Sequence, residues 1–257
     1  MRKCLSQLSI AVLGLTCASF ARAENFYMFS LAGGVLPRYE GSRDYHPFVS
    51  PVIGAEFSNG LFISPESGAG YKKTFSNGLF VSSALSYDFG RTDSNRADLP
   101  GSNYLKGMGR IPGSLIVSVQ VGAHLFGNST VSLTLEPAVT HTSHGLTGHF
   151  DVTLPVLQTI TNDISITGSL HAGTGRYTQT FFGVTEAQSA SSGFAPYSPK
   201  GGFDSAKVSI AWTYTFSPRW SVRTEGGLTR LLGESANSPI VQSKNNYYGM
   251  TALTYRY

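Results

Sequence analysis

The stretch Asn246-Tyr-Tyr-Gly-Met-Thr-Ala-Leu-Thr-Tyr-Arg-Tyr257 decides the fold, because its side chains alternate between two kinds. The set rich in aromatic and apolar groups consists of Tyr247, Gly249, Thr251, Leu253, Tyr255 and Tyr257. A β-strand places this set and the intervening residues on opposite faces. We interpret the segment as the closing strand of an outer-membrane β-barrel, in which the last strand pairs with the first and leaves no open edge. From this segment alone, a solvent-facing strand of a soluble β-protein stays open as an alternative.

A terminal aromatic residue preceded by alternating apolar residues is similar to the signal that the outer-membrane assembly machinery reads. We therefore predict that four residues of the last strand contact this machinery. They are Tyr247, Leu253, Tyr255 and Tyr257.

The N-terminal segment has the pattern of a cleaved secretory signal peptide. Arg2 and Lys3 supply the positive charge, and residues 8–15 form an apolar stretch that is too short for a membrane-spanning helix. The cleavage site is assigned to Ala21, Ala23 and Glu24. Residues 1–23 are thus expected to be removed, and residues 24–257 to form one β-barrel domain.

Both cysteines, Cys4 and Cys17, lie in the expected signal peptide. The mature chain would then have no thiol, which excludes disulfides, cysteine-ligated metals and a cysteine nucleophile. Lipidation of Cys17 is not expected, because Leu15 and Thr16 precede it instead of the small residues of a lipoprotein signal.

The charge balance argues against a nucleic-acid partner. The full chain has 19 basic and 15 acidic residues, and removal of Arg2, Lys3 and Arg22 leaves 16 basic residues. The mature chain is therefore nearly neutral. Charged residues make up 13% of the chain, about half the usual share of ~25%. No apolar run of about 20 residues follows the signal, so any membrane spans would have to be strands.

Three internal segments alternate apolar and polar residues with a period of two, as strands with one apolar face do. They are residues 115–125, 131–139 and 208–216. Such alternation would also suit a soluble sandwich.

The lengths of the connections favour the membrane barrel. Short links are expected at residues 58–60, 76–78, 127–129 and 217–219, and long links at 34–47, 91–112, 177–202 and 232–245. Short and long links mostly alternate, as the periplasmic turns and external loops of outer-membrane barrels do. The Asn59-Gly60 and Asn77-Gly78 pairs belong to a local repeat of residues 57–64 in residues 75–82, so both turns are expected at the same membrane edge.

Together these patterns predict an all-β fold, a single antiparallel transmembrane barrel of about twelve strands. The strands are expected to begin near Asn25, Phe48, Leu61, Gly68, Leu79, Gly113, Thr130, Gly148, Asp163, Phe203, Arg219 and Asn246. A ten-strand alternative stays open if the short pair flanking Pro65 is a folded loop.

Several motifs resemble the MipA/OmpV family, in order and over essentially the whole expected mature chain. They are Tyr39-Glu-Gly-Ser42, Arg176-Tyr177, Phe182-Gly-Val-Thr-Glu-Ala-Gln188, Gly193-Phe-Ala-Pro-Tyr-Ser198, Arg230-Leu-Leu-Gly-Glu234, Ser238-Pro-Ile-Val241 and Leu253-Thr-Tyr-Arg-Tyr257. The chain departs from the family pattern at Tyr257, where Phe is usual, and at Arg43-Asp44, where the family is richer in Asp.

The resemblance implies a Gram-negative outer-membrane barrel whose best-known relative is a scaffold between the lytic transglycosylase MltA and a penicillin-binding protein. Other members are described as porin-like or as adhesins. The family has no agreed catalytic residues, so none is carried over. We expect a non-enzymatic scaffold linked to peptidoglycan remodelling, embedded in outer-membrane lipid. A small channel, a surface adhesin and, least favoured, a lipid-modifying enzyme stay open.

Few residues suggest chemistry of their own. The cluster His141-Thr-Ser-His144, followed by His149 and Asp151, would suit a serine nucleophile with a histidine base, but a polar surface loop explains it better. His124, Glu136 and His171 are expected to face the lumen and to fill it with hydrogen bonds. No cofactor is expected: the Gly173-Thr-Gly175 segment is predicted to lack the following helix that a phosphate-binding loop requires.

Overall fold

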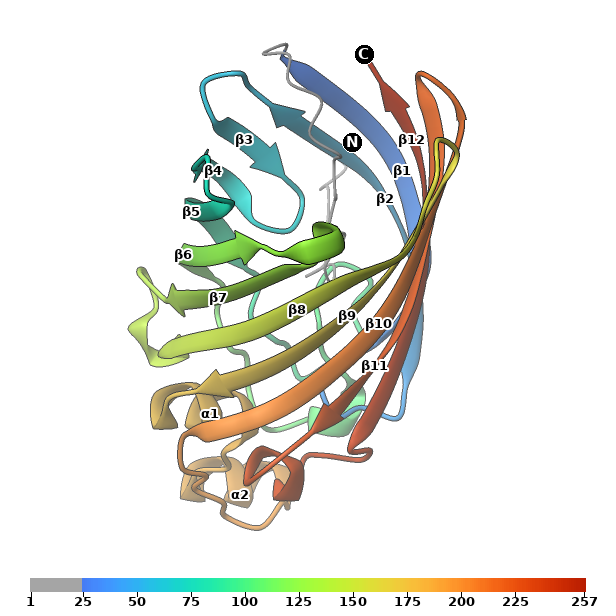
Figure 1. Ribbon diagram of the computed structural model, residues 1–257. Helices are drawn as coiled ribbons and strands as arrows, with labels where there is room; N and C mark the ends of the chain where they lie inside the picture. The colour runs from blue at the N-terminus through green and yellow to red at the C-terminus, as the bar shows by residue number, and fades with distance from the viewer. Residues whose placement is uncertain (1–24) are drawn as a thin grey trace.

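The computed structural model describes residues 25–257, which form a closed antiparallel β-barrel of twelve strands (Figure 1). The expected cleavage residues Ala21, Ala23 and Glu24 lie outside the described residues and stay a prediction. The strands are β1 (Phe26–Pro37), β2 (Tyr45–Glu56), β3 (Leu61–Ser64), β4 (Gly68–Thr74), β5 (Leu79–Asp88), β6 (Ser114–His124), β7 (Thr130–Pro137), β8 (Leu146–Gln158), β9 (Asn162–Gly173), β10 (Gly202–Ser217), β11 (Trp220–Leu231) and β12 (Asn245–Arg256).

Each strand pairs with its sequence neighbours, and β12 pairs with β1 to close the barrel. In this closing seam Leu31 lies opposite Leu253, with Met28 opposite Arg256 further along. The predicted twelve strands are therefore confirmed and the ten-strand alternative is wrong, because β3 and β4 pair with each other and with their neighbours. The largest error in a strand start is at β2, which begins at Tyr45 instead of near Phe48.

The two faces of β12 separate as the alternation predicts. Tyr247 and Leu253 are exposed on the outer surface, whereas Met250 and Ala252 are buried inside the barrel. Tyr248 lines the interior cavity. Because the same outward pattern recurs along the other long strands, the barrel carries an apolar outer band. None of the helices in residues 25–257 is long and apolar enough to cross a membrane.

Short turns occupy one rim of the barrel, and β1 begins and β12 ends there (Figure 1). The two repeated turns share one geometry: Gly60 N donates to Phe57 O at 2.9 Å, and Gly78 N donates to Phe75 O at 3.0 Å. Both glycines have positive φ, which suits Gly best. As predicted, both turns lie at the same edge, which we assign to the periplasm.

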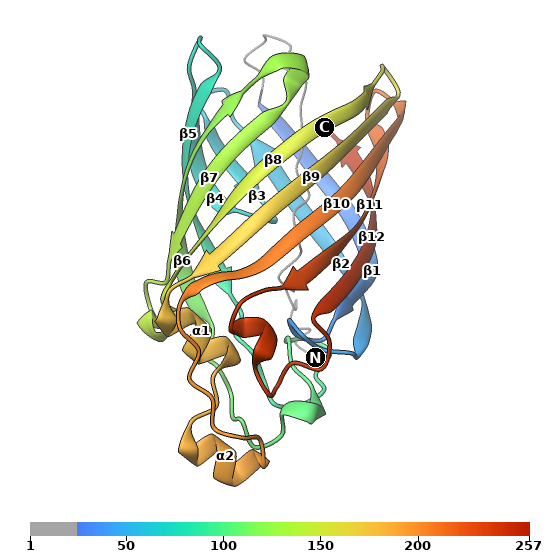
Figure 2. The same cartoon turned by 60° about the horizontal axis from the view of Figure 1, so that its bottom comes forward.

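The opposite rim carries the long connections, which fold over the barrel mouth (Figure 2). Residues 174–201, expected to be an irregular loop, contain the helices α1 (Gly175–Phe182) and α2 (Glu186–Ser192). The prediction that no helix follows Gly173-Thr-Gly175 is therefore wrong, because α1 begins at Gly175 itself. Its first turn is followed by an apolar pair, Phe181 and Phe182, that the cap buries or half-buries.

Candidate functional site

The barrel encloses a cavity of about 1350 Å³ that runs from the underside of the cap to the periplasmic turns. At the cap end it is lined by Tyr39, Arg91 and Tyr177, and at the turn end by Asn128 and Gln158. Between these ends its wall carries many hydroxyl and charged side chains together with apolar ones such as Met28, Phe62 and Phe80. The lumen is therefore the side of the strands that holds the charges, whereas their outer face is apolar.

One wall of the lumen, on β10, β11 and β12, carries a connected set of charges. Arg223 Nη2 lies 3.2 Å from Glu225 Oε2, and Tyr248 donates its hydroxyl hydrogen to Glu225 Oε1 at 2.7 Å. Lys207 Nζ lies 4.8 Å from the centre of the Tyr248 ring. Each charge thus has an opposite charge, a hydrogen bond or a ring beside it, as charges in confined sites require.

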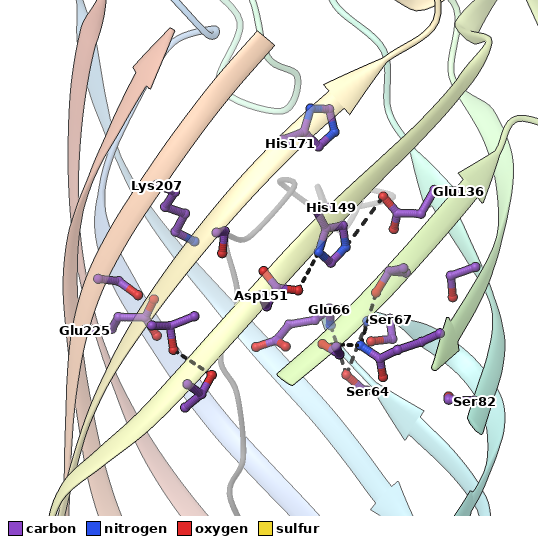
Figure 3. A pocket seen from close by; sticks show the side chains of 18 of the residues that line it. Ser64, Glu66, Ser67, Ser82, Glu136, His149, Asp151, His171, Lys207 and Glu225 are labelled. Atoms are coloured by element: carbon purple, nitrogen blue, oxygen red, sulfur yellow. Dashed lines mark hydrogen bonds and ion pairs between the residues drawn. The ribbon is translucent and has the colours of Figure 1, made fainter. Parts of the chain in front are cut away.

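A second charged set lies on β7, β8 and β9 (Figure 3). His149 Nδ1 lies 2.6 Å from Asp151 Oδ2, while His149 Nε2 lies 3.9 Å from Glu136 Oε2. In the strand register His149 stands directly opposite His171. His171 Nδ1 lies 2.6 Å from Asp204 Oδ1. The lumenal placement predicted for Glu136 and His171 is confirmed, and His124 also lines the cavity.

The turn between β3 and β4 bends into the lumen instead of continuing the wall (Figure 3). Ser64 Oγ accepts hydrogen bonds from the backbone N–H groups of Glu66 and Ser67, which holds the turn closed. Glu66 then projects toward the charged wall, where it interacts electrostatically with Arg223 and Lys207. The sequence patterns did not identify Glu66, Arg223 or Lys207 as lumenal charges. Their only signal was a charge on the polar face of a strand or in a short turn.

The structure separates the residues considered for a serine nucleophile. His144 Nδ1 lies 2.9 Å from Asp88 Oδ2 at the cap, and its ring meets Phe181 edge-on at 5.2 Å. Ser143 uses its carbonyl to accept a hydrogen bond from Thr180 Oγ1. Within residues 25–257 no serine hydroxyl bonds a histidine ring, and no group of three or more His, Cys, Asp or Glu side chains is placed to hold a metal.

The external connections form an extracellular cap, which we define as residues 38–44, 89–113, 138–145, 174–201 and 232–244. It has two small apolar cores. The first contains Tyr39, Leu105, Met108, Val184 and Ile240, and the second contains Phe182, Leu231 and Ala236. Leu105 and Ile240 are fully buried. Loops that bury their own core are held in one arrangement, and this cap lies over the external mouth (Figure 2).

The motifs that carry the family resemblance meet in this cap, except for the one at residues 253–257, which ends at the opposite rim. Tyr39 donates its hydroxyl hydrogen to Ile240 O at 2.8 Å. Val184 and Tyr197 exchange backbone hydrogen bonds of 2.8 and 2.9 Å. Tyr197 also donates to Glu234 O at 2.7 Å. Three connections that are far apart in the sequence, residues 38–44, 174–201 and 232–244, are thereby tied together over the lumen.

Arg91 ties three connections of the cap to one another. Its Nη1 donates to Phe181 O at 2.6 Å, and its guanidinium lies 5.8 Å from the centre of the Tyr39 ring. Burial lowers the pKa of Arg91 to about 10 and raises the pKa of Tyr39 above its ordinary value. Arg91 is therefore a buried cation at neutral pH, compensated by a carbonyl and an aromatic face.

At the periplasmic rim, two neighbouring turns expose large apolar side chains. Phe126 in the β6–β7 turn and Ile160 in the β8–β9 turn are each 98% exposed. The turns are joined by a hydrogen bond from Asn128 Nδ2 to Gln158 Oε1 of 2.8 Å. Uncovered apolar side chains on two neighbouring turns are available for contact with a partner.

The residues predicted to contact the assembly machinery lie on β12 and at its end. Tyr247, Leu253 and Tyr257 are exposed, and the Tyr255 ring packs against the Trp220 ring at 5.0 Å. Their arrangement on one outer face agrees with the alternation, and their role in assembly stays a prediction.

A family model described as MltA-interacting protein MipA matches residues 29–257. No curated protein matches the chain. Among solved structures, an outer membrane channel from Pseudomonas putida F1 is 8% identical over 96% of this chain and 100% of that one, with a TM-score of 0.47. The translocator domain of the autotransporter NalP from Neisseria meningitidis is 11% identical over 91% of this chain and 88% of that one, with a TM-score of 0.48.

Proposed function

The chain belongs to the MltA-interacting protein MipA family, and we propose that it acts as a scaffold that holds a lytic transglycosylase at the outer membrane. It is a β-barrel protein of the outer membrane of a Gram-negative bacterium.

The observation that carries the proposal is the pair of apolar tips at Phe126 and Ile160. A lytic transglycosylase acts on peptidoglycan, so a scaffold must present its docking surface to the periplasm. The periplasmic turns are too short to form a large interface, and the apolar tips are their most exposed side chains in the described chain. A small contact centred on such residues is typical of weak, transient complexes.

The test is a pull-down with the barrel immobilised in detergent and exposed to a solubilised envelope extract of its own host. We expect recovery of a lytic transglycosylase, with a penicillin-binding protein bound through it. The double variant Phe126→Ser/Ile160→Ser should lose both, while the matched cap variant Tyr104→Ser, which also removes an exposed ring, should retain them. Equal recovery with the unmodified barrel, the double variant and the cap variant would rule out the periplasmic tips as the docking surface.

A small gated channel is the second candidate, because the lumen carries charged side chains and is large enough to hold a solute. In this state the cap covers the external mouth, so the intact barrel should be silent in a planar bilayer. A variant that lacks the cap core, such as Leu105→Ala/Ile240→Ala, should then show brief openings. Steady conductance of the intact barrel would contradict the closed state, and silence of both would count against a channel.

A further inference from the structure

Three exposed cations meet at the external rim, where the β1–β2 and β11–β12 connections lie side by side (Figure 2). Arg230, near the end of β11, stands opposite Asn245, the first residue of β12. Lys244 directly precedes β12. Arg43, in the β1–β2 connection, donates from its Nε to Gln242 O at 2.7 Å. We name Arg43, Arg230 and Lys244 the rim cluster.

Each member of the rim cluster is positioned by a neutral oxygen of the protein. Arg230 Nη1 donates to Asn245 Oδ1 at 3.1 Å, and Lys244 Nζ donates to Asn237 Oδ1 at 2.9 Å. Within residues 25–257, Arg43 uses only its Nε, which leaves both terminal nitrogens of the guanidinium for a ligand. The three side chains are therefore held in place while their charge and several of their donors stay available.

The rim cluster has no compensating carboxylate. In the described part of the chain, no Asp or Glu oxygen lies within 4.0 Å of a side-chain nitrogen of Arg43, Arg230 or Lys244. The lumen differs, since Arg223 Nη2 lies 3.2 Å from Glu225 Oε2. Positive charge that the chain leaves uncompensated on its surface favours an anionic partner.

The rim cluster stands at the border of the apolar outer band. Arg230 is two residues from Leu228, so both side chains lie on the same face of β11. Leu228 pairs with Val208 on one side and with Tyr247 on the other, and both of these are exposed on the outer surface. Tyrosine at the end of an apolar band is typical of the membrane–water interface. Arg230 is therefore at the level of the external lipid head groups.

The chemistry of this position selects one class of partner. The outer leaflet of a Gram-negative outer membrane consists largely of glycolipids that carry phosphate groups. A guanidinium binds phosphate through paired N–H donors, and an ammonium adds a point charge. Basic clusters beside a membrane bind anionic head groups in the same way. A zwitterionic phospholipid would leave the three positive charges without compensation.

We infer that the rim cluster binds a phosphorylated glycolipid of the outer leaflet. The phosphate groups accept hydrogen bonds from Arg43, Arg230 and Lys244, and the acyl chains lie against Val208 and Leu228. The site is on the rim opposite to the periplasmic tips, so it goes beyond the scaffold function and does not depend on it.

The test measures the binding of lipid A, the phosphorylated anchor of lipopolysaccharide, to the refolded barrel in detergent by native mass spectrometry. EDTA is present, so that a divalent cation cannot bridge the exposed carboxylate of Asp44 to the lipid. The triple variant Arg43→Gln/Arg230→Gln/Lys244→Gln should bind lipid A at least about tenfold more weakly than the unmodified barrel. Unchanged binding by this variant overturns the site.

The matched control is Lys106→Gln/Arg110→Gln/Arg176→Gln, which removes three exposed cations from other connections of the cap. Its affinity should stay within about twofold of the unmodified barrel, because long-range attraction between exposed charges is screened by salt. An equal loss in both triple variants would show that net charge attracts the lipid and would overturn the rim cluster as a specific site.

Two further arms identify the source of the phosphate. Dephosphorylated lipid A should bind the unmodified barrel about tenfold more weakly, and millimolar inorganic phosphate should not displace lipid A. Displacement by inorganic phosphate would indicate a site for a free anion and overturn the lipid as occupant. Loss of lipid A binding on addition of EDTA would overturn the direct contact in favour of a cation bridge.

Folding of each variant is checked by its heat-dependent shift in gel mobility. If the triple variant does not fold, Arg230→Gln alone should weaken lipid A binding about threefold, and no change would overturn the assignment of Arg230. The rim variants should still recover the transglycosylase in the pull-down, because the tips at Phe126 and Ile160 are untouched. Failure of lipid binding and failure of partner binding are therefore read separately.

Discussion

The two ends of this barrel connect their strands in opposite ways. At the external end, five connections of up to 28 residues (174–201) fold into a cap with its own buried cores. At the periplasmic end, the turns have two residues (218–219) to five residues (125–129) and no core. The contrast is sharpest for one residue type: Phe182 in the cap is 1% exposed, and Phe126 in a turn is 98% exposed.

This difference shows where stability and where binding are located. A connection that buries apolar side chains contributes to the free energy of folding, so its sequence is constrained by packing. A connection that leaves its apolar side chains exposed gains no folding free energy from them. The cap therefore determines whether the lumen is open to the outside, and the turns are free to present residues to a partner.

The strongest test of the comparison makes the same substitution at both ends. Phe182→Ala should lower the free energy of unfolding of the cap by about 3–5 kcal/mol, because it leaves a cavity between Leu231 and Ala236. Phe126→Ala should leave the stability of its turn unchanged. Hydrogen exchange measured by mass spectrometry on the refolded barrel would report faster exchange in residues 174–201 only for Phe182→Ala.

An equal response of both ends to these two variants would mean that the cap is not a packed unit. The barrel strands serve as the internal reference, since their exchange should be the same in both variants. A loss of protection in β12 as well would show that the cap and the wall unfold together.

A smaller effect is expected from the hydrogen bond that ties the first external loop to the last. Tyr39→Phe removes the donor to Ile240 O and leaves that carbonyl buried, which should cost about 1–3 kcal/mol of cap stability. Tyr71→Phe is the control, because Tyr71 is half-exposed on the outer face near the periplasmic turns. The measurement is hydrogen exchange at residues 238–244. Equal exchange rates in the two variants would contradict a stabilising role of this hydrogen bond.

The barrel itself was predictable from the sequence, since period-two alternation and turn chemistry are local. The twelve strands, the apolar face of β12 and the shared geometry of the Asn59-Gly60 and Asn77-Gly78 turns all follow from neighbours in the chain. The repeat of residues 57–64 in residues 75–82 predicted correctly that both turns lie on one rim.

The cap was not predictable in the same way, because its contacts join segments far apart in the sequence. Nothing local indicates that Tyr39 bonds the carbonyl of Ile240, or that Arg91 binds that of Phe181. The helix α1 was missed because Gly173-Thr-Gly175 resembles a strand end. The inward bend at Glu66 depends on where β3 stops pairing with β2, which alternation does not encode.

Within the cap, helix α2 depends on its N-terminal cap. Thr185 accepts a hydrogen bond from Gln188 N, and the Gln188 side chain accepts one from Thr185 N. Thr185→Ala should therefore destabilise α2 by about 1 kcal/mol. Ser191→Ala, which removes only an exposed hydroxyl bonded to Ala187 O, should not destabilise it. Faster exchange at residues 188–193 in the first variant alone is the expected result.

The smallest effect is expected at the exposed edge of the cap, where Arg96 Nη2 lies 2.6 Å from Asp98 Oδ2. The hydrogen bond from Arg96 lowers the pKa of Asp98. A carboxyl group whose pKa is lowered in the folded state stabilises the fold at pH values above its ordinary pKa. This stabilisation is lost as the pH falls through the lowered pKa. At neutral pH the contribution is fully present, yet both side chains are exposed and screened, so Arg96→Gln should leave the stability of the cap unchanged.

The variant should instead change the titration of Asp98, which can be followed by carboxyl carbon NMR. The pKa of Asp98 is expected to move up toward its ordinary value. A pKa that stays the same would mean that the ion pair does not persist in solution, and a loss of cap stability would mean that packing extends further out than the two buried cores.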